Sequence, residues 1–308
     1  GRTRTDSVLD LSAPLTLGLA GWAVARARRV PFVFNIQDVF PDVAIEAGVL
    51  TGRRAIDAAY RLERFTYERA DAVTVLSDDL HDNVVSKLPA TQAGKVHVIP
   101  NFIDTGRIGP GERENAYRRE FGLEGKTVVM YAGNLGFSQP VELLLDAAAA
   151  MQDDSTVAFV VNGGGSARGA LVARAKGLPN VTFVGLQPKE RLAEVLAAAD
   201  IHVVLLRSGL ARASVPSKLF SILAAARPLV ASVDPGTEVA NTVDRAGAGL
   251  AVRPGDAEAL TKALRQLIEQ PEEARAMGAA GRAFVEGWPS PAEISDRYDA
   301  LFASLARR

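Results

Sequence analysis

Residues 201–220 read IHVVLLRSGLARASVPSKLF, an apolar β-rich run followed by a polar, cationic loop and then an apolar helical pattern. Units of this kind build parallel sheets with crossover helices. Pro216 suits a first helical turn, where its missing N–H would have no partner in any case. Ser217 and Lys218 then stand at a helix start, where free amides favour an anion. The alternative is a capped helix whose cationic side chains are solvated. We favour a bound anion, because a lysine in the first helical turn otherwise opposes the helix dipole.

Two arginines lie just upstream of this helix start, Arg207 and Arg212. Arginine and lysine side chains together with free amides fit a diphosphate better than a single small anion. The stretch 212–218 is therefore predicted to bind two linked phosphates.

The same alternation of apolar runs and helical patterns continues on both sides of this stretch. Between residues 127 and 254 it forms a complete doubly wound unit, with strands expected in TVVMYAG, STVAFVVNGGG, VTFVG, IHVVLL, PLVASV and GLAVRP. Upstream, the strand candidates are the opening residues, PFVFNI, AVTVLS and KVHVIPN, too few for a second complete unit. The predicted fold class is α/β, with two Rossmann-like doubly wound parallel-sheet domains, of which the first is truncated.

Composition shifts suggest the domain limits. Residues 107–126 are polar, charged and glycine-bearing, so we expect a first domain at 1–110, a linker at 111–126 and a second domain at 127–288. The tail, 289–308, follows a Trp-Pro break and has the pattern of one amphipathic helix, expected to pack back on the first domain.

Bulk properties exclude several classes of protein. The chain has 308 residues, 48% hydrophobic and 23% charged, with a net charge of −1, so nothing predicts binding to nucleic acid. It has no cysteine, which excludes a disulfide framework and a thiolate metal site and fits a cytoplasmic protein. No run reaches the roughly 18 apolar residues of a membrane span. His81, His97 and His202 lack metal-ligand spacing, so no metal site is predicted.

Two glycine turns follow predicted strands. Gly133, Asn134 and Gly136 follow the run 127–132, and a phosphate site there competes equally with a plain tight turn. Three glycines follow Asn162. Because glycines cost backbone entropy on folding, we expect Gly163 and Gly164 to lie close to a ligand or to the neighbouring domain.

Two carboxylates also stand at strand ends. Asp38 follows PFVFNI, where catalytic or acceptor-binding groups belong, and a loop cap is an equally good interpretation. Glu238 begins the helical pattern after PLVASV and could bind ribose hydroxyls. Taken alone, it is better explained as an acid placed favourably in a first helical turn.

The order of these motifs resembles the retaining glycosyltransferases of family four, with the GT-B fold. The closest resemblance is to the bacterial subgroup of capsular, colanic-acid and O-antigen polysaccharide synthesis. The matching pieces run in the family's order across nearly the whole chain: FNIQDVFPDVAIEAGVL, YERADAVTVLSDDL, KVHVIPNFID, VVMYAGNLGFSQPVELLLDAA, LPNVTFVG, LAAADIHVVLL, VPSKLFSILAAARPLVASVDPGTEVA and GAGLAVRPGD. The resemblance implies two domains facing across a cleft, and a further N-terminal part with a first strand and a glycine-rich loop.

The resemblance also implies roles for particular residues. The residues that resemble the family's donor site are Gly133, Asn134 and Gly136 beside the donor phosphates, Pro216, Ser217 and Lys218 in its PSK turn, Arg212 just before that turn, and Asp38 near the reacting sugar. The chain departs from the family where two glutamates are common, since Ala213 and Ser221 stand there. A common Arg–Lys pair is replaced by the stretch 137–139. Glu238 is then the expected ribose ligand.

The activity implied is transfer of a sugar, with retention, from a nucleoside-diphosphate sugar to a polyprenyl-diphosphate-linked or other glycan acceptor. UDP is favoured over GDP. Lys218 and Arg212 would stabilise the leaving diphosphate without a metal or other cofactor. The protein would be cytoplasmic, with contact to the inner membrane possible through Arg53, Arg54, Arg61, Arg64 and Arg69. Interleaved acids at Asp57, Glu63 and Glu68 favour a solvated helix face instead.

Three other functions compete with this interpretation. A sugar-nucleotide 2-epimerase shares the architecture, but should carry several carboxylates and histidines at strand ends, where this chain has few histidines. A non-catalytic nucleotide-sugar-binding module would explain the missing glutamates. A dehydrogenase is disfavoured because neither glycine turn forms G-x-G-x-x-G with a ribose-binding acid downstream.

Overall fold

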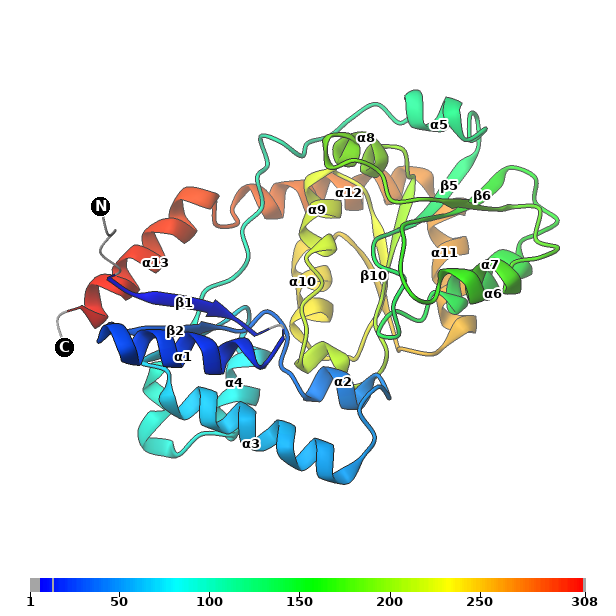
Figure 1. The fold of residues 1–308 in the computed structure, drawn as a ribbon. Helices are drawn as coiled ribbons and strands as arrows, with labels where there is room; N and C mark the ends of the chain where they lie inside the picture. The colour runs from blue at the N-terminus through cyan, green and yellow to red at the C-terminus, as the bar shows by residue number, and fades with distance from the viewer. Residues whose placement is uncertain (1–5, 13, 307–308) are drawn as a thin grey trace. The chain divides into compact units, whose positions relative to one another are not determined.

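A computed structural model describes residues 6–12 and 14–306 of the chain (Figure 1). The chain divides into two compact units. The first unit comprises Gly1–Phe102, Gly209–Val215 and Pro289–Arg308, and the second comprises Ile103–Ser208 and Pro216–Trp288. Each unit holds one parallel sheet, of four strands in the first and six in the second.

The first unit is built on a sheet in the order β1-β2-β3-β4. Its strands are β1 (Val8–Leu11), β2 (Phe32–Asn35), β3 (Ala72–Val75) and β4 (Val96–Val98). Its helices are α1 (Leu17–Arg28), α2 (Asp42–Glu46), α3 (Arg53–Arg69), α4 (Asp78–Ser86) and α13 (Pro291–Leu305), with 3-10 turns η1 (Ala90–Lys95) and η3 (Leu210–Arg212). All the strand pairs are parallel, with Val33 opposite Ala72 and Val73 opposite Val96.

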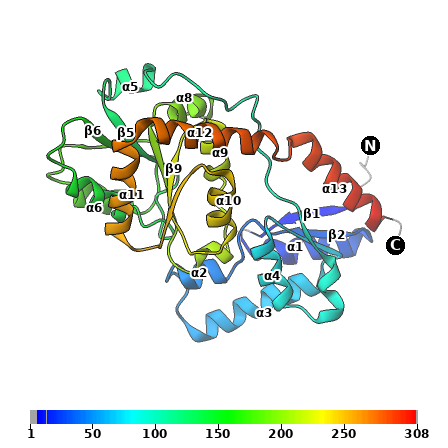
Figure 2. The same cartoon turned by 180° about the vertical axis from the view of Figure 1, so that it is seen from behind.

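Successive side chains of β2 lie on opposite faces of this sheet. Phe34 lies on the side of α1, where a Cβ at Gly18 would come within 3.2 Å of its ring. Val33 lies on the other side and packs with Leu301 of α13. Figures 1 and 2 show the sheet with α1 and α3 on one side and α13 on the other. The C-terminal helix therefore completes the core of the first unit.

The second unit has a sheet in the order β10-β9-β8-β5-β6-β7. Its strands are β5 (Thr127–Ala132), β6 (Val157–Asn162), β7 (Val181–Val184), β8 (Ile201–Leu205), β9 (Leu229–Ser232) and β10 (Gly249–Val252). Its helices are α5 (Ala116–Glu120), α6 (Glu142–Ala150), α7 (Arg168–Arg174), α8 (Leu192–Ala197), α9 (Lys218–Ala224), α10 (Glu238–Ala246), α11 (Ala257–Glu269) and α12 (Pro271–Glu286), with the 3-10 turn η2 (Lys189–Arg191).

Alternating residues of β5 fill two hydrophobic cores, one on each face of this sheet. Val129 and Tyr131 join the core beneath α6 and α11, and Val128 and Met130 join the core beneath α5 and α8. The strand order reverses between β5 and β8, because β6 and β7 extend the sheet on one side and β8 to β10 on the other. In open α/β sheets, ligands bind outside the carboxyl ends of the strands at such a switch point.

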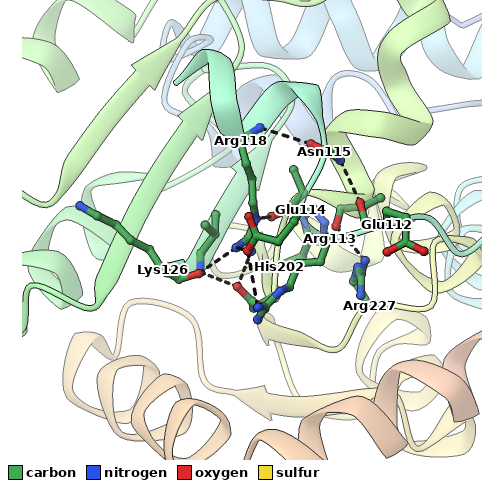
Figure 3. Close-up of polar contacts among 12 residues, drawn as sticks. Glu112, Arg113, Glu114, Asn115, Arg118, Lys126, His202 and Arg227 are labelled. Atoms are coloured by element: carbon green, nitrogen blue, oxygen red, sulfur yellow. Dashed lines mark hydrogen bonds and ion pairs between the residues drawn. The ribbon is translucent and has the colours of Figure 1, made fainter. Parts of the chain in front are cut away.

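The predicted α/β class with two parallel sheets is confirmed, and the boundary between the units lies earlier than the sequence suggests. The stretch 111–126 packs within the second unit. Its Arg118 is fully buried and pairs with Asp200 at 2.5 Å. Arg118 also pairs with Glu114 at 2.8 Å (Figure 3). Arg118 also donates hydrogen bonds to the carbonyl oxygens of Ala198 and Lys126. A segment whose charges suggest a solvated linker is therefore held in place by a buried guanidinium.

Candidate functional site

A cavity of about 590 Å³ opens in the second unit at the carboxyl ends of β5 and β6. One wall is apolar and consists of Leu186, Pro188, Leu192, Val195 and Leu196. The remaining lining is Ala132, Gly133, Asn162, Gln187, Lys189, Ser217, Lys218 and Ser221. No carboxylate is among these described residues, so the cavity combines an apolar side with a cationic side.

Two other cavities of the second unit do not lie at the carboxyl ends of its strands. One of about 800 Å³ lies along α6 and α11, lined by residues such as Asp146, Lys262 and Gln266. Another, of about 440 Å³, is lined by Thr127 and Ile201, at the amino ends of β5 and β8. The cavity at the carboxyl ends is therefore the candidate functional site.

Lys218 is the main charge in this site. Its Nζ donates a hydrogen bond to the hydroxyl of Tyr131 at 2.8 Å and lies 4.1 Å from the centre of that ring. Among residues 6–12 and 14–306, no carboxylate forms an ion pair with it. Burial lowers the pKa of Lys218 to about 8. A largely buried ammonium without a counter-ion is costly, and a bound anion would remove that cost.

Tyr131 connects Lys218 to the first glycine turn. Its hydroxyl accepts from Lys218 and donates to the backbone oxygen of Asn134 at 2.6 Å. Burial raises the pKa of Tyr131 well above its ordinary value, so the hydroxyl stays neutral and keeps its donor proton. The position of the lysine is thus linked to the backbone after β5.

Backbone packing explains two of the glycines. Gly133 has φ +147°, and a Cβ there would lie 3.0 Å from Lys218 Nζ. Gly163 has φ +157°, and a Cβ there would lie 1.9 Å from the carbonyl oxygen of Gly133. The first glycine makes room for the lysine. The second lets two neighbouring turns touch, so its close approach is to backbone within the same unit.

The structure brings together only part of the predicted site. Gly133, Ser217 and Lys218 line the cavity. The predicted residues that are not among its described lining are Asn134, Gly136, Gly163, Gly164, Pro216 and Glu238. Glu238 is engaged on its own helix, where its Oε1 accepts from Arg245 at 2.6 Å and from Thr242 at 3.1 Å.

Arg212 and Asp38 belong to the first unit, whereas Lys218 belongs to the second. Within the first unit, Asp38 forms an isolated antiparallel bridge with Ser214. Arg212 is exposed, and its backbone oxygen accepts a hydrogen bond from Asn83 at 3.4 Å. Residues 209–215, which follow β8 of the second unit, are therefore attached to the loop after β2.

Other predicted charges have structural partners. Arg207 pairs with Glu142 at 2.9 Å and donates to the backbone oxygen of Phe137, so its charge is already compensated.

His202 is fully buried and contacts the backbone oxygen of Leu196 through Nε2 at 3.0 Å. Burial lowers the pKa of His202 to about 4, which makes it a neutral core residue. The described residues contain no group of three His, Cys, Asp or Glu arranged to hold a metal ion.

The α3 helix presents its arginines to solvent. Arg53, Arg54, Arg61, Arg64 and Arg69 are all exposed. Glu63 is expected from the sequence to lie between these arginines on the solvated face, but it is buried and accepts a hydrogen bond from Lys87 at 2.8 Å. Burial raises the pKa of Glu63 to about 7. Within the described part of the chain, no helix is both long and apolar enough to cross a membrane.

Two residues that the sequence reasoning did not single out belong to the site, Tyr131 and Asn162. Each is a polar side chain near the carboxyl end of an otherwise apolar strand. That position is the only signal of their role in the sequence, and it does not show which face of the sheet the side chain occupies.

Two parallel-sheet α/β units, the second with a cavity at the carboxyl ends of its central strands, have the architecture of the GT-B fold. The structure has a TM-score of 0.77 with sucrose-phosphate synthase from Thermosynechococcus elongatus, at 20% identity, covering 97% of this chain and 73% of that one. Its TM-score is 0.80 with Anabaena Alr3699/HepE in complex with UDP-glucose, at 16% identity, covering 97% and 79%.

Family comparison identifies the group. Residues 6–107 match the family Glycosyltransferase Family 4, and residues 126–270 match Glycosyl transferases group 1. The chain therefore carries a family 4 glycosyltransferase domain and a group 1 glycosyltransferase domain, which confirms the resemblance to family 4 and the expected enzyme class.

Two curated relatives agree with this assignment. The chain is 29% identical over 279 residues to the putative colanic acid biosynthesis glycosyl transferase WcaI of Escherichia coli, covering 88% of this chain and 68% of that protein. It is 28% identical to the probable glycosyltransferase WbjE of Pseudomonas aeruginosa, covering 86% and 67%.

Proposed function

We propose that this glycosyltransferase takes a sugar from a nucleoside-diphosphate sugar and transfers it to a glycan acceptor in cell-surface polysaccharide synthesis. The observation that carries the proposal is Lys218, a largely buried cation without an acidic partner in the described residues, in a cavity with an apolar wall. The lysine provides the charge for a diphosphate, and the wall of Leu186, Leu192 and Leu196 provides a surface for a nucleobase. The α9 helix has only seven residues, so the lysine matters more than the helix dipole.

We favour UDP over GDP as the nucleotide and a polyprenyl-diphosphate-linked glycan as the acceptor. Support for UDP comes from HepE, which was solved with UDP-glucose and has the same fold. Support for a polysaccharide product comes from WcaI, which is described as acting in colanic acid biosynthesis. The exposed arginines of α3 are consistent with peripheral contact to anionic lipid on the cytoplasmic face of the inner membrane.

The transfer proposed is retaining and needs no metal. The bond between the anomeric carbon and the diphosphate oxygen breaks, a bond from that carbon to the acceptor oxygen forms on the same face, and the acceptor proton passes to the leaving phosphate. Lys218 and Arg212 would stabilise the charge that develops on the diphosphate, and Asp38 would lie near the reacting sugar. No enzymatic nucleophile is required.

Calorimetric titration of UDP and GDP into the wild type and Lys218→Ala tests the proposal. Loss of one charge-assisted contact should weaken UDP at least about tenfold. Lys176→Ala, which removes an exposed lysine of the same unit, is the matched control and should bind as the wild type does. Equal UDP affinity in all three proteins would refute the assignment of the cavity.

Product analysis separates the competing activities. Incubation with a UDP-sugar and glycan acceptor, with and without EDTA, should give the same glycosylated product and UDP release. A new sugar nucleotide formed from UDP-GlcNAc without acceptor would instead indicate an epimerase. UDP binding without any turnover would indicate a binding module.

A further inference from the structure

Asn162 is a polar residue that lines the cavity. It is the last residue of β6, is only 5% exposed, and lines the cavity beside Gly133. The hydroxyl of Tyr117 donates a hydrogen bond to its Oδ1 at 2.8 Å, within the protein interior. One half of the side-chain amide is therefore held by the protein, and the remaining half is its Nδ2 amino group.

The described residues offer no hydrogen-bond acceptor to this Nδ2. Nδ2 is not one of the described buried side-chain atoms that lack a partner, so this donor is accessible from the cavity, where it can donate to an oxygen of a ligand. Because Asn162 lines the cavity while its Oδ1 is bound to Tyr117, the free donor is available to whatever occupies the cavity.

Tyr117 is well placed to fix this orientation. Its side chain is fully buried, its ring centre lies 4.8 Å from that of Phe121, and its backbone N–H donates to Glu194 at 2.8 Å. The guanidinium of Arg191 lies 6.0 Å from the ring. Burial raises the pKa of Tyr117, so the hydroxyl keeps its proton and remains a donor to Asn162.

The position of β6 in the sheet indicates which part of a ligand Asn162 would meet. β6 lies between β5 and β7. The turn after β5 meets Lys218, and the chain after β7 contributes Leu186 of the apolar wall. Asn162 thus stands between the cationic side and the apolar side of the cavity, on the path from diphosphate to base.

We propose that Asn162 is a specificity-determining residue, which donates a hydrogen bond from Nδ2 to an oxygen of the nucleoside, and that Tyr117 is a positioning residue that holds it. This inference rests on the proposed function, because it requires a nucleotide in the cavity. It goes beyond that function by naming the group that distinguishes a nucleotide from a bare diphosphate.

Calorimetry with two probes, UDP and inorganic pyrophosphate, tests this inference. Asn162→Ala should weaken UDP about five- to tenfold, the size expected for one hydrogen bond, and leave pyrophosphate affinity unchanged. Tyr117→Phe removes a single oxygen and is the gentler variant, should Asn162→Ala fold poorly. It should weaken UDP by a smaller factor, and it should have no further effect once Asn162 is alanine.

Asn180→Ala is the matched control. Asn180 is also a buried asparagine of the second unit, but its Nδ2 binds the backbone oxygens of Ala148 and Met151. Asn180→Ala should lower the melting temperature without changing the UDP affinity. Asn162→Ala would behave in the same way if the role of Asn162 were purely structural.

The outcomes distinguish this inference from the function on which it rests. If the wild type binds neither UDP nor pyrophosphate, the proposed function fails, and this inference fails with it. If the wild type binds both and Asn162→Ala binds UDP equally well, or loses both probes in parallel, only the role of Asn162 is refuted. Additive effects of Tyr117→Phe and Asn162→Ala on UDP affinity would refute the positioning role of Tyr117.

Discussion

Gly133 leaves open the space beside the ammonium group of Lys218. A Cβ at position 133 would lie 3.0 Å from Nζ and 3.3 Å from Cε of that lysine. Because Lys218 also donates a hydrogen bond to Tyr131, two residues before Gly133, the lysine cannot shift without losing that bond. The geometry of the turn and the position of the charge therefore depend on each other.

Gly133→Ala should displace Lys218 and weaken UDP binding about tenfold, with some loss of stability because φ is +147°. Gly164→Ala is the control, since a Cβ there would have no atom within 4 Å. Titration calorimetry and thermal melting of both variants check the prediction. Wild-type UDP affinity in Gly133→Ala would show that the contact has no role in binding.

Nucleotide affinity should fall as the pH rises through about 8. The pKa of Lys218 is lowered by burial to about 8, so above that pH the amine becomes neutral and no longer attracts a diphosphate. Binding of an anion should raise this pKa, and the protein should then take up protons near pH 8. Calorimetry in buffers of different ionisation enthalpy measures that uptake. Lys218→Met should abolish it, and uptake that persists in this variant would assign it to another group.

Arg118→Ala should destabilise the second unit by about 2–4 kcal/mol, because it removes a buried guanidinium that binds Asp200 and two backbone oxygens, although Asp200 keeps its ion pair with Arg113. Denaturant unfolding followed by circular dichroism measures the change. Arg119→Ala removes the neighbouring exposed arginine and should change stability by less than about 0.5 kcal/mol. Similar losses in both variants would contradict a special role for the buried pair.

Stability should also fall as the pH drops from about 6.5 to 4, partly through His202. Its pKa is lowered to about 4 in the folded protein, so in this window the unfolded chain binds a proton that the folded chain does not. The difference amounts to about 3–4 kcal/mol at most, by 1.36 kcal/mol per pKa unit. In urea titrations at several pH values, the free energy of unfolding of His202→Asn should fall less steeply with decreasing pH than that of the wild type. Parallel profiles would exclude His202 as the source.

Much of the second unit could be predicted from the sequence because each of its strands is a continuous apolar run. The meeting of Gly133 and Lys218 was also predictable, since carboxyl ends of neighbouring parallel strands share one edge. The contact of Tyr117 with Asn162 was not, because it joins residues 45 apart and depends on how α5 packs. The same holds for Arg118, whose partner Asp200 is 82 residues away. Charge alone made its segment resemble a linker.

Residues 209–215 have a practical consequence for dissecting the protein. The chain passes from one unit to the other at 102/103, 208/209, 215/216 and 288/289. A clone of 103–288 would carry Leu210 and Ala213, which are buried in the whole protein, without the remainder of the first unit around them. Such a fragment would expose apolar side chains and be prone to self-association. Because each unit consists of separate segments of the chain, neither unit can be expressed as one continuous natural fragment. Fragments for screening or crystallisation therefore need a redesigned stretch after Ser208.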